Sequence, residues 1–249
     1  MTLRIDEALM TSENYFSWCG EVGVLFHNAS ETGQLISIVQ QQIEQLGFDY
    51  FALNIWHPVP FTRPETHLFT TFPARWVSHY RQKKYVEVDP IVRMRHSPGK
   101  IVQWKEDIFV DCGRLWREAN DFGLRAGFSC SIMATNRATG ILSVSSRISL
   151  KTIDVDPTFQ MKFQHLTELY LTALMRLGDR SMLVLDMVFT ERELEIVKWT
   201  AEGKTAAEIS LILGISQHTV NFHQKNMQKR FNAANKTQLA CYAAATGLI

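Results

Sequence analysis

The sequence predicts an α+β protein in two parts: an N-terminal α-β-α sandwich around a central antiparallel sheet, and a C-terminal all-α helix-turn-helix domain. Before residue 178, segments rich in β-branched and aromatic residues alternate with amphipathic helical segments. From residue 189 to 231, short amphipathic helices surround a glycine-containing turn, and the last of them is basic. The 249 residues are enough for two domains of ordinary size.

The N-terminal part is expected to have helices on both sides of its sheet. In its second helix apolar residues recur at spacings of three and four, and Gly47 ends the pattern. We expect helices at residues 13–27, 32–46, 74–84 and 157–177. Alternating apolar segments bounded by polar or proline-rich turns predict the strands. We expect strands at residues 49–57, 66–72, 127–134 and 140–146, the last two as a hairpin.

The C-terminal part carries start and stop signals for several short helices. Thr190 is a good N-cap residue, and Glu193 three positions later completes a capping box. Gly203 is expected to end this first helix in a left-handed conformation. Thr205 and Ser216 are the predicted caps of the next two helices. A final helix over residues 236–246 carries an apolar stripe that fits either the core or a self-pairing face.

The third helix of this part has two distinct faces. At about 100° per residue, one face is predicted to pack on the core through Val220, His223, Met227 and Phe231. On the opposite face, Asn221 and Lys225 are one helical turn apart, so both can enter a major groove together and contact base edges. Ser216, Thr219, Lys229 and Arg230 are better placed for phosphates. The predicted DNA-binding residues are Thr205, Ser216, His218, Thr219, Asn221, Phe222, Lys225, Gln228, Lys229 and Arg230.

The distribution of charge favours DNA binding more than the net charge of +1 does. From residue 214 to 249 there are four Lys or Arg residues and no acidic residue, whereas glutamates are frequent just before this stretch. A three-helix unit with a merely solvated polar face would share the caps and stripes. The ordered caps, the turn and the acid-free third helix together favour a DNA-binding unit with double-stranded DNA as its partner.

Other classes of protein find little support in the sequence. The four cysteines lie far apart without a C-x-x-C pair, so neither a metal site nor a disulfide framework is predicted, and no cofactor is expected. No signal peptide and no membrane-spanning segment is recognised, which indicates a soluble, cytoplasmic protein. The G-x-S-x-G, H-E-x-x-H and zinc-deaminase patterns and the phosphate-binding loops are missing, so we do not expect an enzyme.

The chain resembles a known family in both parts. TERELEIVKWTAEGKTAAEI followed by ISQHTVNFHQKNMQKRF is similar to the LuxR-type helix-turn-helix, including Glu193, Val197 (where Leu is usual) and Gly203. Upstream, the order of Trp76, Tyr80, Asp89-Pro90, Trp104 and Gly127 resembles the acyl-homoserine-lactone-binding domains of quorum-sensing regulators.

This resemblance implies a ligand, a site and an assembly. The ligand would be an acyl-homoserine lactone in an apolar cavity, with Trp76 donating to the ring carbonyl, Asp89 accepting from the amide, and Ser143 and Tyr80 near the acyl carbonyl. Ala52 departs from the family, which often has a hydroxyl residue there. The implied ligand-binding residues are Trp76, Tyr80, Asp89, Ser143, Phe72, Leu68, Trp104, Leu115, Trp116, Ala52 and Ile141.

The resemblance also implies a homodimer in which residues 1–177 bind the ligand and dimerise, 178–187 form a linker, and 188–249 bind DNA. Plainer interpretations stay open. Asp89-Pro90 is also an ordinary helix start, and Trp76 and Tyr80 could be core aromatics. The N-terminal part could also be a dimerisation domain that needs no ligand, or a lactone-cleaving enzyme fused to a DNA-binding domain.

Overall fold

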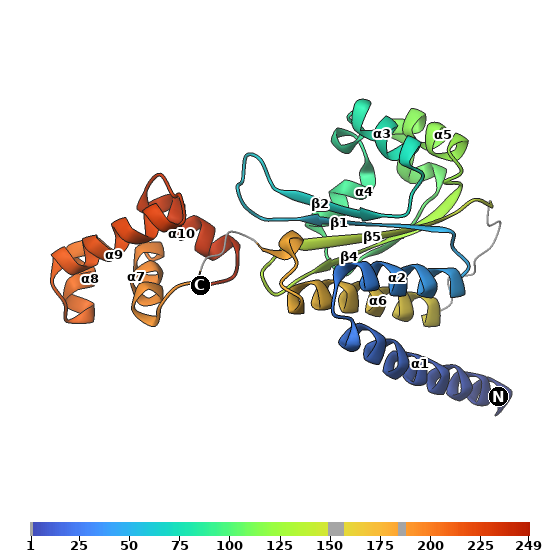
Figure 1. Ribbon diagram of the computed structural model, residues 1–249, viewed down its shortest axis with the longest axis horizontal. Helices are drawn as coiled ribbons and strands as arrows, with labels where there is room; N and C mark the ends of the chain where they lie inside the picture. Colours follow the sequence, from blue (N-terminus) through green and yellow to red (C-terminus); the bar gives the residue numbers. More distant parts are fainter. Residues whose placement is uncertain (1, 149–156, 184–187) are drawn as a thin grey trace. The chain divides into compact units, whose positions relative to one another are not determined.

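The computed structural model describes residues 2–148, 157–183 and 188–249. The chain divides into two compact units (Figure 1). Unit 1 comprises Met1–Trp56, Thr66–Ala134 and Thr139–Met182. Unit 2 comprises Leu183–Ile249 together with the loop segments His57–Glu65 and Thr135–Ala138. Part of the predicted linker, residues 184–187, lies outside the described residues.

Unit 1 contains a five-stranded antiparallel sheet with the strand order β2-β1-β5-β4-β3. The strands are β1 Tyr50–Trp56, β2 Thr66–Thr70, β3 Ile101–Gln103, β4 Ala126–Met133 and β5 Thr139–Ser146. The sequence predicted four of these strands. The edge strand β3 was not predicted, because three residues are too few to show a period of two.

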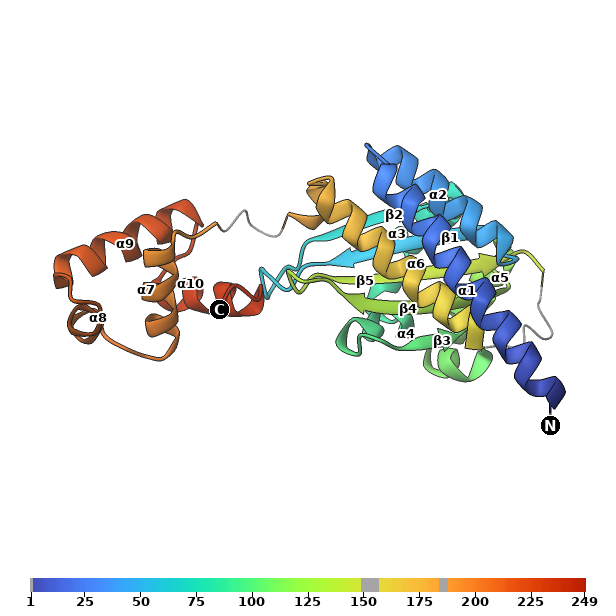
Figure 2. The ribbon, with the colours of Figure 1, turned by 90° about the horizontal axis from the view of Figure 1, so that it is seen from below.

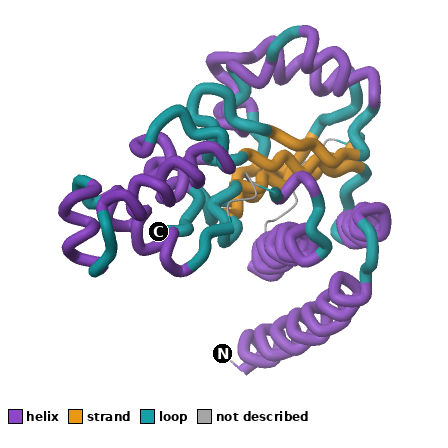
Figure 3. The backbone as a smooth tube through the Cα atoms, turned by 60° about the vertical axis from the view of Figure 1, so that its left-hand side comes forward, coloured by secondary structure: helices purple, strands orange, loops and turns teal. Residues whose placement is uncertain are grey.

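Helices cover both faces of the sheet, which confirms the predicted α-β-α sandwich (Figures 1 and 3). One face carries α1 Thr2–Asn28, α2 Thr32–Gln45 and α6 Pro157–Arg176. The other carries α3 Ala74–Gln82, α4 Pro90–Arg93 and α5 Gly113–Asp121, with short 3-10 turns between them. The predicted first helix begins earlier than expected, at residue 2. Helix α1 runs outside α2 and α6 (Figure 2), and Trp18 Nε1 donates to Gln42 Oε1 of α2 at 2.9 Å.

The alternation of β1 separates the core from the opposite face of the sheet. Phe51, Leu53 and Ile55 are fully buried, and the Phe51 ring lies 6.2 Å from that of Tyr170 on α6. Ala52, Asn54 and Trp56 therefore point to the other face, toward α3, α4 and α5. Strand β1 thus contributes to the hydrophobic core with one face. Its other face forms part of the sheet surface that α3, α4 and α5 cover.

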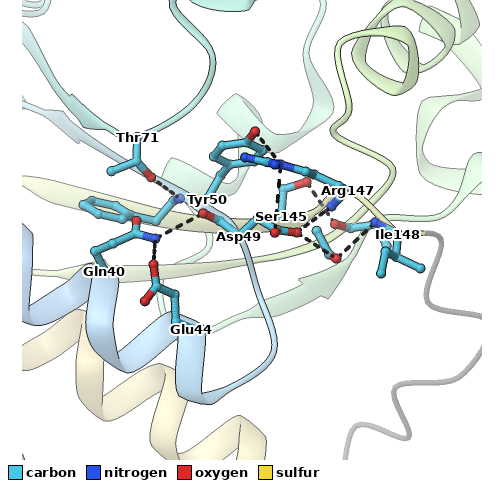
Figure 4. Close-up of polar contacts among 11 residues, drawn as sticks. Gln40, Glu44, Asp49, Tyr50, Thr71, Ser145, Arg147 and Ile148 are labelled. Carbon is cyan, nitrogen blue, oxygen red and sulfur yellow. Dashed lines mark hydrogen bonds and ion pairs between the residues drawn. The ribbon is translucent and has the colours of Figure 1, made fainter.

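The start of β1 is held by polar contacts from two other elements (Figure 4). The Arg147 backbone N–H donates to Asp49 Oδ2 at 2.8 Å, and Gln40 Nε2 on α2 donates to the Asp49 carbonyl at 3.1 Å. Arg147 Nε also donates to the Tyr50 hydroxyl at 2.7 Å, and its guanidinium lies 4.9 Å from the centre of the Tyr50 ring. These contacts support a register in which Ala52 lies opposite Ser143 of β5.

Unit 2 holds a bundle of short helices, α7 Glu191–Ala201, α8 Ala206–Leu213, α9 Gln217–Arg230 and α10 Lys236–Ala245. The capping box of Thr190 and Glu193 is confirmed, and Thr205 forms a second one with Glu208. Ser216 caps α9 by accepting from the Thr219 N–H at 3.0 Å. These helix starts depend on neighbours within four residues, which is why the sequence predicted them.

The inner faces of these helices form one core. The apolar stripe of α10 belongs to it, since Leu239, Tyr242 and Ala243 are buried there. On α9, Val220 and Met227 are buried as predicted, and so is Phe231 directly after the helix, while His223 is half-buried. Gln224 is buried as well, which was not predicted. Its Nε2 donates to Thr200 Oγ1 of α7 at 3.0 Å, so the side-chain amide is hydrogen-bonded within the bundle.

Candidate functional site

A cavity of about 320 Å³ lies in unit 1 between the sheet and helices α3, α4 and α5. Its lining is mainly apolar, with a few polar groups, as in sites for amphipathic small molecules. Every ligand-binding residue implied by the resemblance lines this one cavity. Ala52, Leu68, Ile141 and Ser143 come from strands of the sheet. Trp76 and Tyr80 come from α3, Leu115 and Trp116 from α5, and Phe72, Asp89 and Trp104 from connecting segments.

The Asp89 carboxylate is a polar group of this lining whose pKa is shifted by burial. It accepts hydrogen bonds from the Tyr80 hydroxyl at 2.8 Å and from the Ile91 N–H at 2.8 Å. Burial raises the pKa of Asp89 to about 6, although both hydrogen bonds act in the opposite direction. Asp89 is also the N-cap of α4, followed by Pro90 at its first turn. The plain interpretation as a helix start is therefore correct, and the same carboxylate lines the cavity.

Trp76 and Tyr80 face the cavity from successive turns of α3. Their ring centres are 5.8 Å apart, and Trp76 is 5% exposed. Burial and the neighbouring Asp89 raise the pKa of Tyr80, so its hydroxyl stays protonated and can donate. Within residues 2–148, 157–183 and 188–249, Trp76 Nε1 forms no hydrogen bond. The indole N–H is thus a donor without a protein partner, and it belongs to a residue that lines the same cavity as the Asp89 carboxylate.

A second polar chain reaches the cavity through the sheet. Trp104 Nε1 donates to Ser129 Oγ at 2.8 Å, and Ser129 Oγ lies 2.8 Å from Ser143 Oγ. A serine hydroxyl has one proton and two acceptor positions. Because Ser129 already accepts from Trp104, it can give its proton to Ser143, which leaves the Ser143 proton for a group in the cavity. Ser129 was not predicted, because it lines no cavity and acts only through Ser143.

The close packing of Trp104 against the backbone requires a glycine at position 127. A Cβ atom at Gly127 would lie 2.6 Å from the Trp104 indole, closer than carbon atoms can approach. The backbone also fixes Trp104, because its backbone N–H donates to the Gly127 carbonyl at 2.8 Å. The glycine therefore lets the indole lie flat against β4, where its ring nitrogen reaches Ser129.

The roof of the cavity is held together by one carboxylate on α5. Glu118 accepts from the Tyr85 hydroxyl and from Arg114 Nε at 2.7 Å, and its Oε2 lies 2.5 Å from His79 Nε2 on α3. These hydrogen bonds, that of Tyr85 first, lower the pKa of Glu118 to about 2. The Trp76 ring stacks 6.3 Å from Tyr85. Glu118 thus connects α5 to the element that presents the Trp76 indole.

Several lining residues were not predicted from the sequence. They are Asn54, Trp56, Thr66, Thr70, Val77, Arg81, Val86, Ile91, Val92, Phe109, Ala119 and Leu124. Asn54 and Trp56 could have been found, because they continue the alternation of Ala52 along β1. The residues of α4 and α5 carried no such signal, because these helices are short and their packing on the sheet depends on distant parts of the chain.

In unit 2, α9 presents most of the predicted DNA-binding residues to solvent. Asn221, Phe222, Lys225 and Lys229 are exposed, Gln228 and Thr219 are half-buried, and Thr205, Ser216 and His218 are exposed. Arg230 is exposed as well, but it has partners within the unit. Its Nη2 lies 2.7 Å from Glu193 Oε2 and donates to the Val188 carbonyl at 3.0 Å. The structure thus gives Arg230 a role in holding α9 to the start of α7.

No group of three or more His, Cys, Asp or Glu residues in the described part of the chain is arranged to hold a metal ion. No helix in it has the length and apolar character needed to cross a bilayer.

Comparison with known proteins identifies both units. Residues 31–169 match the family described as autoinducer binding domain, and residues 187–243 match the bacterial regulatory proteins of the luxR family. The regulatory protein SdiA of Escherichia coli (strain K12) is 44% identical over 241 residues, which cover 96% of this chain and all of that protein. The chain belongs to the LuxR family of bacterial regulatory proteins. It is a ligand-responsive quorum-sensing transcription regulator with an autoinducer-binding domain and a helix-turn-helix domain.

Other family members agree with this assignment. The quorum-sensing regulator RhlR of Pseudomonas aeruginosa is 37% identical over 216 residues, covering 86% of this chain and 89% of RhlR. A crystal structure of E. coli SdiA matches with a TM-score of 0.90 at 44% identity over 94% of this chain and 99% of that one. The structure of SdiA in complex with octanoyl-rac-glycerol matches with a TM-score of 0.89 at 44% identity, over 94% and 96%. The predicted LuxR-type family and the α+β fold are confirmed.

Proposed function

We propose that this regulator binds an acyl-homoserine lactone in the cavity of unit 1 and, as a homodimer, binds operator DNA through α9. The observation that carries the ligand proposal is Asp89, a buried carboxylate at the polar end of an apolar cavity. Its protein partners, Tyr80 and Ile91, are neutral and leave its pKa raised. An amide N–H from a ligand would add a charge-assisted hydrogen bond, worth about 1.5–3 kcal/mol.

The polar groups of the cavity suit both ends of such a ligand head. We assign the ligand amide N–H to Asp89, the ring carbonyl to the Trp76 indole N–H and the acyl carbonyl to Ser143. In this arrangement the hydrogen-bond chain runs from the Trp104 indole N–H through Ser129 to Ser143, and the Ser143 hydroxyl donates its proton to the acyl carbonyl. The acyl chain then lies over the aliphatic side chains of Leu68 and Ile141 on the floor of the cavity.

A relative supports an amphipathic ligand of this kind. A solved structure shows SdiA in complex with octanoyl-rac-glycerol, which joins a polar head to an eight-carbon acyl chain. The same division into a polar end near Asp89 and an apolar remainder is present here. Acylglycerols are therefore a second ligand class worth testing beside the lactones, and both use the same acyl-binding surface.

For DNA, we propose that Asn221 and Lys225 contact bases, while Lys229, Ser216 and Thr219 contact phosphates. All lie on the outer side of α9 or at its start. A two-fold dimer would bind half-sites about one helical turn of DNA apart. We propose residues 1–177 as the ligand-binding and dimerisation domain, 178–187 as the linker and 188–249 as the DNA-binding domain.

We propose that the protein binds its ligand without cleaving it. Nucleophilic catalysis by a serine requires an adjacent base. In the described structure the hydrogen-bond partner of the Ser143 hydroxyl is another serine, Ser129, which cannot serve as one. Incubation with lactone should return the ligand chemically unchanged and in stoichiometric amounts, whereas turnover would favour an enzyme.

The proposal is tested by mass spectrometry of small molecules that co-purify with the protein after growth with and without a mixture of lactones. Retention of a lactone, together with operator binding that depends on it, supports a ligand-controlled regulator. Equal operator binding with and without lactone would instead support the alternative in which unit 1 serves only as a dimerisation domain.

A further inference from the structure

The floor of the cavity carries a polar side chain that the head-group contacts above do not use. Asn54 lies on β1 with Leu68 of β2 and Ile141 of β5 as its cross-strand neighbours, and all three line the cavity. In the part of the chain that the structure describes, the Asn54 side chain makes no hydrogen bond. The Asn54 side chain is a primary amide with two donors and one acceptor oxygen. It therefore lies between two aliphatic side chains in the part of the cavity assigned to the acyl chain.

Three other polar residues of the floor differ from Asn54 in this respect. Ser143 is bonded to Ser129, and Thr70 Oγ1 donates to the Phe51 carbonyl and accepts from the Phe72 N–H, each at 2.9 Å. Thr66 is exposed at the start of β2. Trp56, the next residue on this face of β1, has a buried indole N–H that also lacks a partner, but it can only donate. Among these floor residues, Asn54 is the one that can both donate to and accept from a group inside the cavity.

The register of the sheet places Asn54 beyond the head-group contacts. Ala52 and Ser143 form one cross-strand pair, and Asn54 and Ile141 form the next pair on the same face. Two residues along a strand correspond to about 6.6 Å. On the other side of the Ala52 pair, Tyr50 and Phe72 meet edge to face with ring centres 6.5 Å apart, and Arg147 covers Tyr50 (Figure 4). On the Asn54 side the cavity continues to Trp56, so an acyl chain leaving Ser143 passes over Asn54.

We propose that Asn54 is a specificity-determining residue that selects acyl chains carrying a hydrogen-bonding oxygen, an oxo or a hydroxyl group, over unsubstituted chains of equal length. This inference rests on the proposed function. The amide N–H₂ donates to either oxygen, and the amide oxygen accepts from a hydroxyl. A plain methylene chain removes water from the amide and offers no partner, so the discrimination acts mainly against the plain chain.

The experiment compares octanoyl-, 3-oxo-octanoyl- and 3-hydroxy-octanoyl-homoserine lactone by isothermal titration calorimetry on the full-length protein. The wild type should bind both oxygenated lactones roughly tenfold more tightly than the plain one, which corresponds to about 1.4 kcal/mol. Asn54→Leu should bring all three close to equal affinity, chiefly by tightening the plain lactone. Thr66→Val is the matched control on the neighbouring strand and should keep the wild-type preference.

Asn54→Asp separates the two oxygen substituents. An ionised carboxylate only accepts, so this variant should keep binding to the hydroxylated lactone and lose it for the oxo lactone. Asn54→Ala replaces Asn54→Leu if the larger side chain prevents folding, with the same expected loss of preference.

Two results would overturn the assignment of Asn54 while leaving the proposed function intact. One is equal affinity of the wild type for all three lactones, and the other is an unchanged preference for oxygenated chains in Asn54→Leu. Failure of the wild type to bind any of the three lactones would instead overturn the proposed function, and this inference with it.

Discussion

Each of the two units buries a carboxylate, and the pKa values of these two carboxylates are shifted in opposite directions. Glu193 in unit 2 is 6% exposed, and burial acts to raise its pKa, but hydrogen bonds from Arg230 and Thr190 outweigh that effect and lower it. Asp89 in unit 1 has a neutral hydroxyl and a backbone N–H as partners, and burial prevails. The difference is a paired cation: Arg230 pairs with Glu193 in unit 2, whereas no cation among the described residues forms an ion pair with Asp89.

The contrast between the two buried carboxylates indicates where a ligand can act. In unit 2 the caps of Thr190, Thr205 and Ser216 and the ion pair of Glu193 satisfy the helix ends internally. In unit 1 the Asp89 carboxylate, the Trp76 indole N–H and the Asn54 amide retain unused hydrogen-bonding capacity around one cavity. A guest that uses this capacity stabilises unit 1 and leaves the internal contacts of unit 2 as they are.

The largest expected effect is on the pH dependence of stability in the free protein. The pKa of Asp89 rises from 3.8 to about 6 on folding, so the ionised form destabilises the fold by roughly 3 kcal/mol at neutral pH. Because the folded state holds this proton more tightly, the Asp89 contribution to stability falls as pH rises from about 4 to 6. Asp89→Asn should therefore be the more stable protein in urea unfolding at pH 7, with a difference that shrinks toward pH 4.

Glu193→Gln is the matched control for that prediction. A pKa that is lowered on folding contributes stability above its unfolded value and loses it as pH falls. This variant should be less stable than the wild type at pH 7, and the loss should diminish in acid. If both substitutions change stability at pH 7 in the same direction, the contrast between the two units does not hold.

The next effect concerns ligand binding. Loss of the charged acceptor in Asp89→Asn should weaken lactone binding ten- to a hundredfold, as expected for a charge-assisted hydrogen bond of about 1.5–3 kcal/mol. Binding to the wild type should weaken below about pH 6, where Asp89 takes up a proton. A thermal-shift titration measures both effects. Residues 188–249 expressed alone should still bind DNA, and equal ligand-induced shifts in wild type and variant would refute the role of Asp89.

Two lysines on the outer side of α9 test the DNA-binding surface. Lys225→Ala should reduce discrimination between operator variants by about 1–3 kcal/mol at the base it contacts. Lys229→Ala should leave base preference unchanged and lower the slope of log K against log salt by about 0.9, one phosphate contact. Gel-shift titrations at several salt concentrations distinguish the two. The reverse pattern would mean that the two lysines have exchanged roles.

The smallest effect separates structure from DNA binding at Arg230. Because its guanidinium is paired with Glu193, Arg230→Ala should destabilise unit 2 by about 1 kcal/mol, a modest value because the arginine is partly exposed. The salt slope of DNA binding should not change. A slope lowered by about 0.9 at unchanged stability would restore the phosphate contact predicted from the sequence.

The sequence predicted the helical unit more completely than the cavity. The starts of α7, α8 and α9 and the turns at Gly203 and Gly214, both left-handed, depend on residues close along the chain. What it missed there is long-range: Gln224 bonded to Thr200, and Arg230 paired with Glu193 across 37 positions. In unit 1, periodicity predicted the main strands and helices but neither β3 nor α5, and the cavity residues came from the family resemblance.

From the amino-acid sequence alone, most of the elements, their order and the family could be predicted, because periodicity, capping and turn residues act over a few positions. The tertiary structure decided which side chains share a space. Only the register of β1 with β2 and β5 puts Asn54 between Leu68 and Ile141, and only the packing of α3 on the sheet buries Asp89 with a tyrosine instead of a cation. Those outcomes depend on segments far apart in the chain meeting at van der Waals distance, which no local pattern encodes.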